Sequence, residues 1–169
     1  MLKEVAIIGT HGLPPVYGGF ETWCHQITQG LSGKFNFTVI GEKNSKNTNY
    51  DYSHLNYREI SFSKSNDSIF YYLHSLYNVR NNRLIIIVGL GAALWIPIFR
   101  LFYKSKIYVN IDGLEWKRAK WKFHERLFLR FSEWLCVIFS NKIIVDSIGI
   151  KKYCLNIYPF ISSTKYELI

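Results

Sequence analysis

Carboxylates, cations and aromatic rings are crowded into the segment 112–121, which reads D-G-L-E-W-K-R-A-K-W. Its ten residues hold two carboxylates, two tryptophans and three basic side chains. Carboxylates accept hydrogen bonds from sugar hydroxyls, aromatic faces cover sugar C–H surfaces, and cations hold phosphate. The alternative is a solvated charged loop with both tryptophans packed into the core. The combination favours a binding site for a sugar or a phosphorylated ligand.

A glycine- and proline-rich segment, 9–22, reads G-T-H-G-L-P-P-V-Y-G-G-F-E-T. Its paired Gly18 and Gly19 come directly before a helical pattern, where backbone N–H groups and the helix dipole attract phosphate. An ordinary strand-to-helix loop also uses glycine in its turn, so spacing alone leaves both interpretations open. The G-x-G-x-x-G dinucleotide fingerprint is absent. Glu42, just past the next apolar run, keeps a ribose-binding acid as a weaker alternative.

Histidines and cysteines show no metal-ligand spacing. Of the five histidines only His11, inside the glycine-rich segment, is retained as a candidate functional residue. Cys24, Cys136 and Cys154 are odd in number, far apart and in apolar contexts, so we expect small core residues rather than a disulfide framework or a zinc site. A reduced, cytoplasmic setting without a metal cofactor follows.

The elements that must position these segments alternate along the chain. Apolar runs predict strands at 4–9, 37–40, 57–62, 84–88, 106–111 and 142–147. Helical spacing predicts helices at 20–31, 68–79, 92–102, 123–139 and 148–156, and the polar stretch 43–56 predicts an exposed loop. The alternation indicates an α/β, Rossmann-like, doubly wound and mostly parallel sheet, with 5–8, 84–88, 107–111 and 143–145 at its centre. Such sheets bind ligands beyond the carboxyl ends of their strands, where both candidate segments begin.

Length and composition set further limits. The 169 residues suffice for about one domain, and 49% hydrophobic with 17% aromatic content excludes a disordered chain. The start of the chain runs straight into a strand-like segment, so no secretory signal is expected. The longest uncharged apolar stretch, 84–99, is shorter than the roughly 18 residues that indicate a membrane span, and two glycines interrupt it.

The net charge of +9 is unevenly distributed. Residues 1–79 carry six basic and six acidic side chains, whereas 80–169 carry fifteen and six. Such asymmetry indicates an anionic partner: nucleic acid, acidic lipid or a phosphorylated substrate. Nucleic acid is disfavoured because no RNP, zinc-finger or helix-turn-helix pattern occurs.

A membrane surface remains a candidate partner because six cations fall within 117–130, offset only by Glu125. Trp121 and an exposed apolar edge of helix 123–139 would add interfacial contact. The alternative is that these charges only solubilise a basic protein.

With these segments the sequence resembles the N-terminal domain of bacterial GT-B glycosyltransferases of the capsular and exopolysaccharide rhamnosyltransferase type. Their G-T-x-G-[IL]-P-x-x-Y-G-G-F-E-T motif matches 9–22, their D-G-L-E-W-K-R-x-K-W motif matches 112–121, and a later V-D-S matches 145–147. The resemblance covers nearly the whole chain. One departure is His11, where an arginine is usual.

The resemblance implies transfer of a sugar, often L-rhamnose, from a nucleotide-diphosphate donor such as dTDP-rhamnose to a lipid-linked saccharide, with retention at the anomeric carbon and without a metal. It implies that Gly18 and Gly19 contact the donor diphosphate. The acceptor-side residues implied are His11, Asp112, Glu115, Lys117 and Arg118, and no catalytic residue is assigned. We expect a peripheral protein on the inner face of the plasma membrane, with Lys120, Lys122, Arg126 and Arg130 at the membrane surface.

The resemblance further implies a C-terminal, donor-binding Rossmann domain that this sequence lacks. Residues 1–169 would be a single acceptor-side domain, inactive alone, whether as a truncated gene, an excised domain or a half that needs a partner chain. The alternative is a non-catalytic module that binds a membrane surface or a lipid-linked diphosphate.

Overall fold

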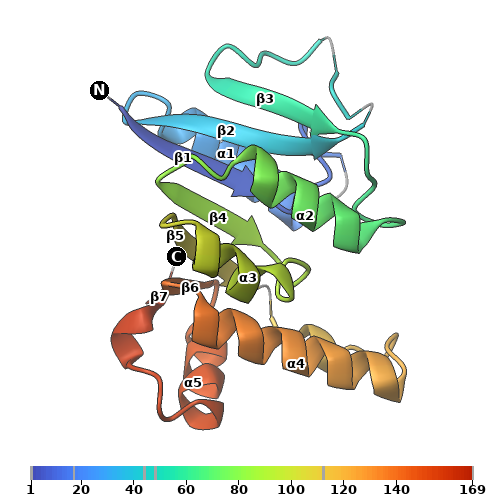
Figure 1. The fold of residues 1–169 in the computed structure, drawn as a ribbon, viewed down its shortest axis with the longest axis vertical. Coiled ribbons are helices and arrows are strands. Elements are labelled where there is room, and N and C mark those ends of the chain that lie inside the picture. The colour runs from blue at the N-terminus through green and yellow to red at the C-terminus, as the bar shows by residue number, and fades with distance from the viewer. Residues whose placement is uncertain (1, 17, 44, 48, 112, 169) are drawn as a thin grey trace.

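The computed structural model describes residues 2–16, 18–43, 45–47, 49–111 and 113–168 (Figure 1). The strands are β1 (Lys3–Ile8), β2 (Phe35–Glu42), β3 (Leu55–Ile60), β4 (Leu84–Val88), β5 (Lys106–Ile111), β6 (Lys142–Val145) and β7 (Tyr166–Leu168). The helices are α1 (Gly19–Gly30), α2 (Ser68–Asn78), α3 (Trp95–Phe102), α4 (Phe123–Phe139) and α5 (Ile148–Ile157), with short 3-10 turns η1 (Glu115–Lys117) and η2 (Ser163–Lys165).

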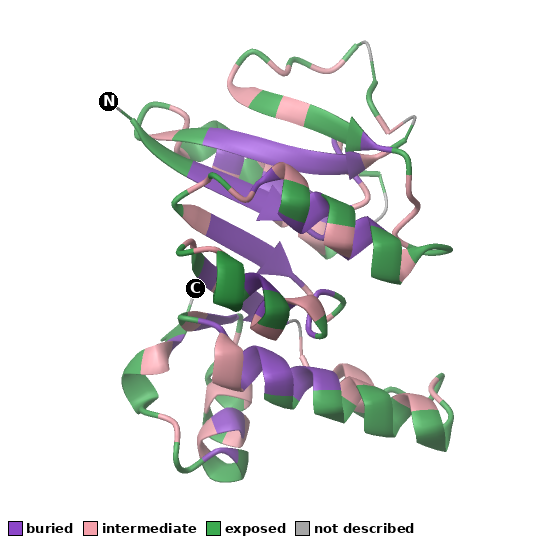
Figure 2. Ribbon diagram, viewed as in Figure 1, coloured by how far each residue is buried: buried purple, intermediate pink, exposed green. Residues whose placement is uncertain are grey.

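The strands form one seven-stranded sheet in the order β3-β2-β1-β4-β5-β6-β7, and every neighbouring pair is parallel. The four strands predicted to lie at its centre are consecutive neighbours, β1, β4, β5 and β6. Their residues are almost all buried because helices or loops cover both faces, as a parallel sheet requires (Figure 2). The predicted Rossmann-like architecture is confirmed.

Helices lie on both faces of the sheet. In β1, Val5 and Ile7 pack in a core with Cys24 of α1, whereas Ala6 and Ile8 pack in the larger core under α2–α5. This split follows from the alternation of side chains along a strand. Figure 1 shows α2, α3 and α4 in front of the sheet and α1 behind it. The right-handed crossovers explain the arrangement, because the chain crosses the sheet in one direction from β1 to β3 and in the opposite direction from β3 to β7.

Element boundaries differ from the predictions at a few places. Strand β3 begins at Leu55, inside the stretch predicted as a loop, because it pairs in register with β2. Helix α3 begins at Trp95 rather than at 92, since 92–94 form a turn. The edge strand β7 has three residues, of which only Tyr166 is buried, too few to give an apolar pattern.

Helix α4 is much longer than the strand it precedes. Its 17 residues span about 25 Å, whereas the four residues of β6 span about 13 Å. Its N-terminal half therefore extends past the sheet, so that Phe123, Leu127 and Phe131 are exposed and only Leu135 of the apolar stripe is buried. In the part of the chain that is described, no helix has both the length and the apolar content needed to cross a bilayer.

Candidate functional site

The candidate site lies at the carboxyl edge of the sheet, where both motif segments leave their strands. The glycine-rich loop follows β1, and the charged loop follows β5. Strand β4 lies between them, so the two loops start about 10 Å apart, at two strand spacings. Near the middle, Phe20 of α1 approaches Gly89, which follows β4. The two segments therefore border one open edge, as expected for a ligand site in such a sheet.

Glu21 fastens the glycine-rich loop to the first turn of α1. Its side chain is buried, and its Oε1 accepts the backbone N–H of His11 at 2.9 Å. Thr22 adds a second link by donating its hydroxyl to the carbonyl of Gly18 at 3.1 Å. The acidic and hydroxyl residues of the F-E-T motif therefore shape the loop and link His11 to the first turn of α1, which Gly18 and Gly19 open.

Gly18 and Gly19 open helix α1 without any packing reason to be glycine. A Cβ at Gly19 would meet no described atom within 4 Å, and one at Gly18 would meet only Glu21 Oε2, at 3.7 Å. Gly9 differs, because its φ is +95° and a Cβ there would lie 2.4 Å from the carbonyl oxygen of Val88. Since the first N–H groups of a helix lack intrahelical acceptors, the uncovered start of α1 is suited to an anionic group.

His11 lies three residues beyond the end of β1 and is partly buried. Its Nδ1 contacts Oε1 of Glu42, the last residue of β2, so this carboxylate orients the imidazole ring. Lys64 lies near Glu42 and Glu21; burial lowers the pKa of its ammonium group, and the two carboxylates oppose that effect. Glu21, Glu42 and Lys64 therefore form a cluster of mixed charge next to His11 of the glycine-rich loop.

Glu115 is the centre of the charged loop. Its carboxylate accepts the Trp121 indole N–H at 3.1 Å and lies 2.9 Å from Arg118 Nε and 3.0 Å from Lys120 Nζ. Lys117 is exposed on the same turn, and its Nζ lies 5.4 Å from the Trp116 ring centre. The turn therefore brings Glu115, Lys117 and Arg118 together, but Glu115 is engaged within the loop. Asp112 lies outside the described residues.

Comparison with protein families matches residues 2–168 to one family, described as a domain of unknown function, DUF1972. The chain belongs to the DUF1972 family. No curated protein shows significant sequence similarity to this DUF1972 domain.

Solved structures identify its fold. Sucrose-phosphate synthase from Thermosynechococcus elongatus superimposes with a TM-score of 0.73 at 13% identity, over 99% of this chain and 47% of that one. HepE from Anabaena, solved with UDP-glucose, gives 0.65 at 13% identity, over 100% and 43%. UGT89C1 from Arabidopsis thaliana, solved with UDP-L-rhamnose, gives 0.62 at 12% identity, over 100% and 48%.

The DUF1972 domain therefore has the fold of one half of a GT-B glycosyltransferase and spans less than half the length of these proteins. UDP-N-acetylglucosamine 2-epimerase from Rickettsia bellii shares the fold as well, with a TM-score of 0.58 at 15% identity, over 99% of this chain and 44% of that one. The fold alone thus leaves the reaction open.

The DUF1972 domain also holds a buried acid that the sequence analysis missed. Oε1 of Glu133, on α4, accepts the hydroxyls of Tyr158 at 2.7 Å and Tyr153 at 3.1 Å. Burial raises the pKa of Glu133, opposed by both hydroxyls, the charge of Arg130 and the Trp116 indole. Its only sequence signal is its position on the inner side of α4, three residues before the buried Cys136. Glu133 thus joins α4 and α5 beneath the charged loop.

The cations predicted for the membrane surface are all exposed, and they continue from the charged loop onto α4. Lys120 pairs with Glu115, and Arg126 Nε donates to the carbonyl of Trp121 at 3.0 Å. The Arg130 guanidinium lies 5.2 Å from the Trp116 ring centre. Lys122 directly precedes α4, and its backbone N–H donates to Glu125.

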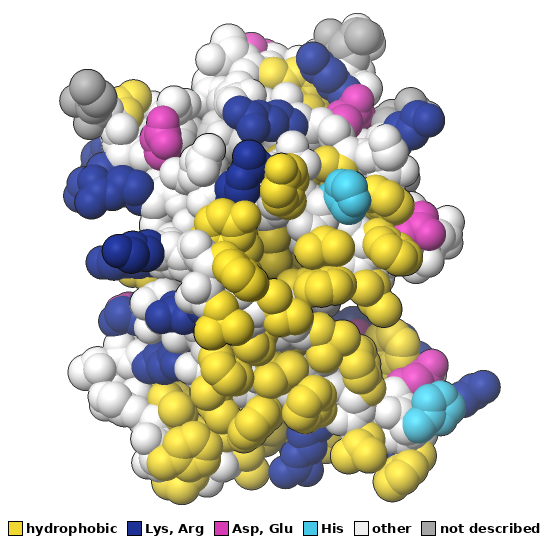
Figure 3. All heavy atoms as spheres, in the orientation of Figure 1, with side chains coloured by type: hydrophobic (Ala, Val, Ile, Leu, Met, Phe, Trp, Pro, Cys, Tyr) yellow, Lys and Arg dark blue, Asp and Glu magenta, His cyan; other side chains and the backbone are white. Residues whose placement is uncertain are grey.

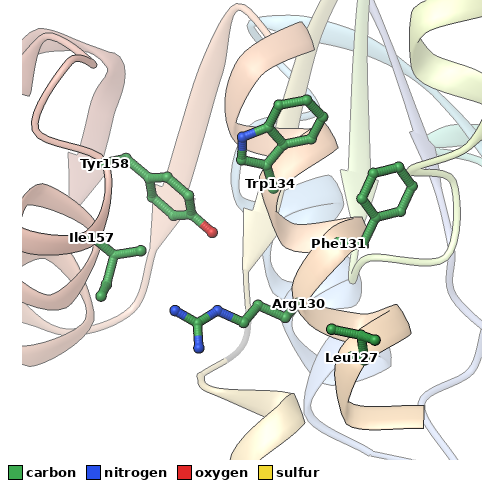
Figure 4. Close-up of a pocket in the computed structure, with 6 residues that line it drawn as sticks. All are labelled: Leu127, Arg130, Phe131, Trp134, Ile157 and Tyr158. Carbon is green, nitrogen blue, oxygen red and sulfur yellow. The ribbon is translucent and has the colours of Figure 1, made fainter. Parts of the chain in front are cut away.

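A pocket of about 330 Å³ lies on the helical flank, between α4 and the end of α5 (Figure 4). The residues that line it are Leu127, Arg130, Phe131, Trp134, Ile157 and Tyr158. None of them belongs to the two motif loops. Among the described residues, no group of three histidine, cysteine or acidic side chains is placed to hold a metal ion.

Proposed function

We propose that this domain is the N-terminal, acceptor-side half of a retaining glycosyltransferase. The donor is a nucleotide-diphosphate sugar such as dTDP-rhamnose, and the acceptor is a lipid-linked saccharide used in surface polysaccharide synthesis. The observation that carries the proposal is the start of α1, where Gly18 and Gly19 are exposed and packing against the described residues would permit larger side chains.

A nucleotide diphosphate suits that position electrostatically. Its phosphates carry the negative charge that the positive end of a helix dipole attracts, and glycine lets them approach the backbone. HepE and UGT89C1, which share the fold, were solved with UDP-glucose and UDP-L-rhamnose. The choice of rhamnose, and retention at the anomeric carbon, rest on the motif resemblance.

The acceptor occupies the other side of the open edge. Lys117, exposed on η1, is the cation best placed to meet the diphosphate of a lipid-linked acceptor, because Arg118 is paired with Glu115. Hydroxyl groups of the saccharide bind Asp112 and His11, the latter oriented by Glu42. No catalytic base is assigned, since a retaining transfer can rely on the donor phosphate and on positioning.

A second Rossmann domain completes the enzyme and holds the nucleotide base, the ribose and the donor sugar. This division is supported by the coverage of less than half of each similar structure. The domain works at the cytoplasmic face of the plasma membrane, where Lys120, Lys122, Arg126 and Arg130 favour an anionic surface at about 1 kcal/mol per cation.

A transferase assay tests the proposal. The domain is incubated with dTDP-rhamnose and a lipid-linked saccharide, first alone and then with a C-terminal donor-binding half. We expect no transfer from the domain alone and transfer from the pair. Gly19→Ala should reduce transfer, since its methyl group obstructs the diphosphate. The matched control, Gly33→Ala, also meets no described atom within 4 Å but lies in the exposed turn before β2, and should leave transfer unchanged.

Calorimetry on the domain alone gives an independent check. We expect only weak binding of a nucleotide sugar, so a low-micromolar dissociation constant would contradict the division of roles. Binding of a lipid-linked diphosphate without transfer, even with a C-terminal half present, would instead support a non-catalytic binding module.

A further inference from the structure

Large apolar side chains are exposed on three adjacent helices. Leu101 and Phe102 of α3 are 80% and 74% exposed, and Phe123 of α4 is 84% exposed. Single exposed apolar residues are normal on a protein surface, but a contiguous group of this kind marks an interaction site.

Each helix presents these residues on one side. In α4, Phe123, Leu127, Phe131 and Trp134 follow helical spacing, and α3 contributes Ile98, Leu101 and Phe102. Phe70 and Tyr77 of α2 are seven residues apart, two turns along the same side. We call the exposed residues of these helices the apolar face; they are Ile69, Phe70, Tyr77, Ile98, Leu101, Phe102, Phe123, Leu127, Phe128, Phe131 and Trp134.

The three helices lie side by side, so their exposed residues merge. Helix α3 packs against both α2 and α4. Figure 3 shows hydrophobic side chains gathered continuously over α2, α3 and α4, with basic side chains beside them. The apolar face therefore covers one broad side of the domain.

Charges around the apolar face are mostly basic. Helix α2 contains no acidic or basic residue other than His74, and α3 contains only Arg100. On α4 the acids are Glu125, which caps the first turn, and Glu133, which is buried. The exposed charges of these helices are therefore dominated by arginine.

The pocket between α4 and α5 opens into the apolar face, because Leu127, Phe131 and Trp134 belong to both. Among its lining residues Arg130 is the charged one (Figure 4). Apolar walls around a guanidinium match an anionic amphiphile, with its charged group on Arg130 and its hydrocarbon chain along the rings.

We infer that the domain docks on an anionic lipid bilayer through the apolar face, with lipid hydrocarbon against α3 and α4 and anionic head groups on the arginines. A second copy of the chain is a poorer occupant, because each copy carries a net charge of +9 and would bring its arginines to the interface. Interfacial helices combine these features, namely aromatic and aliphatic residues on one side with basic residues beside them.

Only the purpose of this docking rests on the proposed function, because a lipid-linked acceptor would then reach the domain from the membrane side. It differs from docking through the cations alone, because it requires the apolar side chains of α3, which lie outside the basic segment.

Vesicle co-sedimentation tests the inference without donor, acceptor or a second domain, so its outcome is independent of any transferase assay. Vesicles of phosphatidylglycerol and phosphatidylcholine are compared with phosphatidylcholine alone. We expect binding that needs phosphatidylglycerol and falls about tenfold or more in the Leu101→Ser/Phe102→Ser variant, which loses two large apolar contacts. The control variant, Leu2→Ser/Ile148→Ser, removes exposed apolar side chains outside the apolar face and should bind as the wild type does.

Site-specific labelling locates the contact. The three native cysteines are buried, so an introduced cysteine can be labelled selectively with an environment-sensitive dye. A dye at Leu101→Cys should shift to the blue on anionic vesicles, whereas a dye at Leu2→Cys should not. Equal binding of the two serine variants, or an unshifted dye at position 101 on bound protein, would overturn the inference. So would a blue shift without lipid accompanied by dimers in sedimentation velocity, which would assign the apolar face to a second copy.

Discussion

Glu133 makes the stability of the domain depend on pH in an unusual direction. Desolvation raises the pKa of its buried carboxyl group above the usual value, and the hydroxyls of Tyr158 and Tyr153 only partly oppose this. The folded state therefore holds this proton more tightly than the unfolded state does. The contribution of Glu133 to stability is full below the unfolded pKa, about 4.3, and is lost as pH rises through the folded pKa.

The Glu133→Gln variant removes this ionisation while keeping an oxygen for the two tyrosines. Each pH unit between the unfolded and folded pKa values costs the wild type about 1.4 kcal/mol, and the variant does not incur this cost. At low pH the variant should be the less stable protein, because its amide group brings a donor towards the Trp116 indole N–H, and a mispaired buried polar group costs about 1–3 kcal/mol. As pH rises above the unfolded pKa, the stability of the variant relative to the wild type should increase until the pH has passed the folded pKa of Glu133.

Urea unfolding of both proteins across this pH range measures the difference directly. Thermal melting provides a second readout, since 1 kcal/mol shifts Tm by about 2–4 °C in a domain of this size. Glu4→Gln, at an exposed position in β1, is the matched control, and its free energy of unfolding should vary with pH as that of the wild type does. A difference between Glu133→Gln and the wild type that stays constant with pH would refute the reasoning.

Two further predictions concern packing. Gly91→Ala should lower the free energy of unfolding by about 1–3 kcal/mol in urea titrations, because its Cβ would lie 2.0 Å from Cε2 of the buried Tyr72; a variant as stable as the wild type would contradict this. Cys24, Cys136 and Cys154 should resist a thiol reagent at pH 8 until the domain unfolds, because burial raises the pKa of each thiol; rapid labelling of one thiol under native conditions would show that its element opens locally.

The central strands were predictable because strands buried on both faces are almost continuously apolar, as Leu84–Val88 illustrates. The motif loops were predictable in place, since each follows such a strand. The hydrogen bonds and ion pairs within the loops were not predictable. Nothing in the order of charges indicates that Glu115 accepts the indole N–H of Trp121 and also pairs with Arg118 and Lys120. Pairing within a loop depends on its folded path.

The exposure of α4 shows a second limit of sequence patterns. The exposed apolar edge expected for helix 123–139 is present at Phe123, Leu127 and Phe131, but their spacing does not indicate how far the sheet covers that side. The burial of Glu133 was not predicted for a related reason, because a single acid in an amphipathic helix is normally solvated. Both features depend on tertiary contacts, which a local pattern does not contain.

The glycines of the first loop are present for two different reasons, one steric and one related to the proposed ligand. Gly9 is demanded by the chain itself, since any other residue would collide with the Val88 carbonyl. Packing does not require glycine at 18 and 19, so a related protein without the proposed diphosphate site could replace both glycines and still fold. Among related sequences, glycine at 9 should therefore be kept wherever the fold is kept, and glycine at 18 and 19 wherever the proposed diphosphate site is kept. Related proteins that keep the fold but have lost the proposed diphosphate site would carry larger residues at positions 18 and 19.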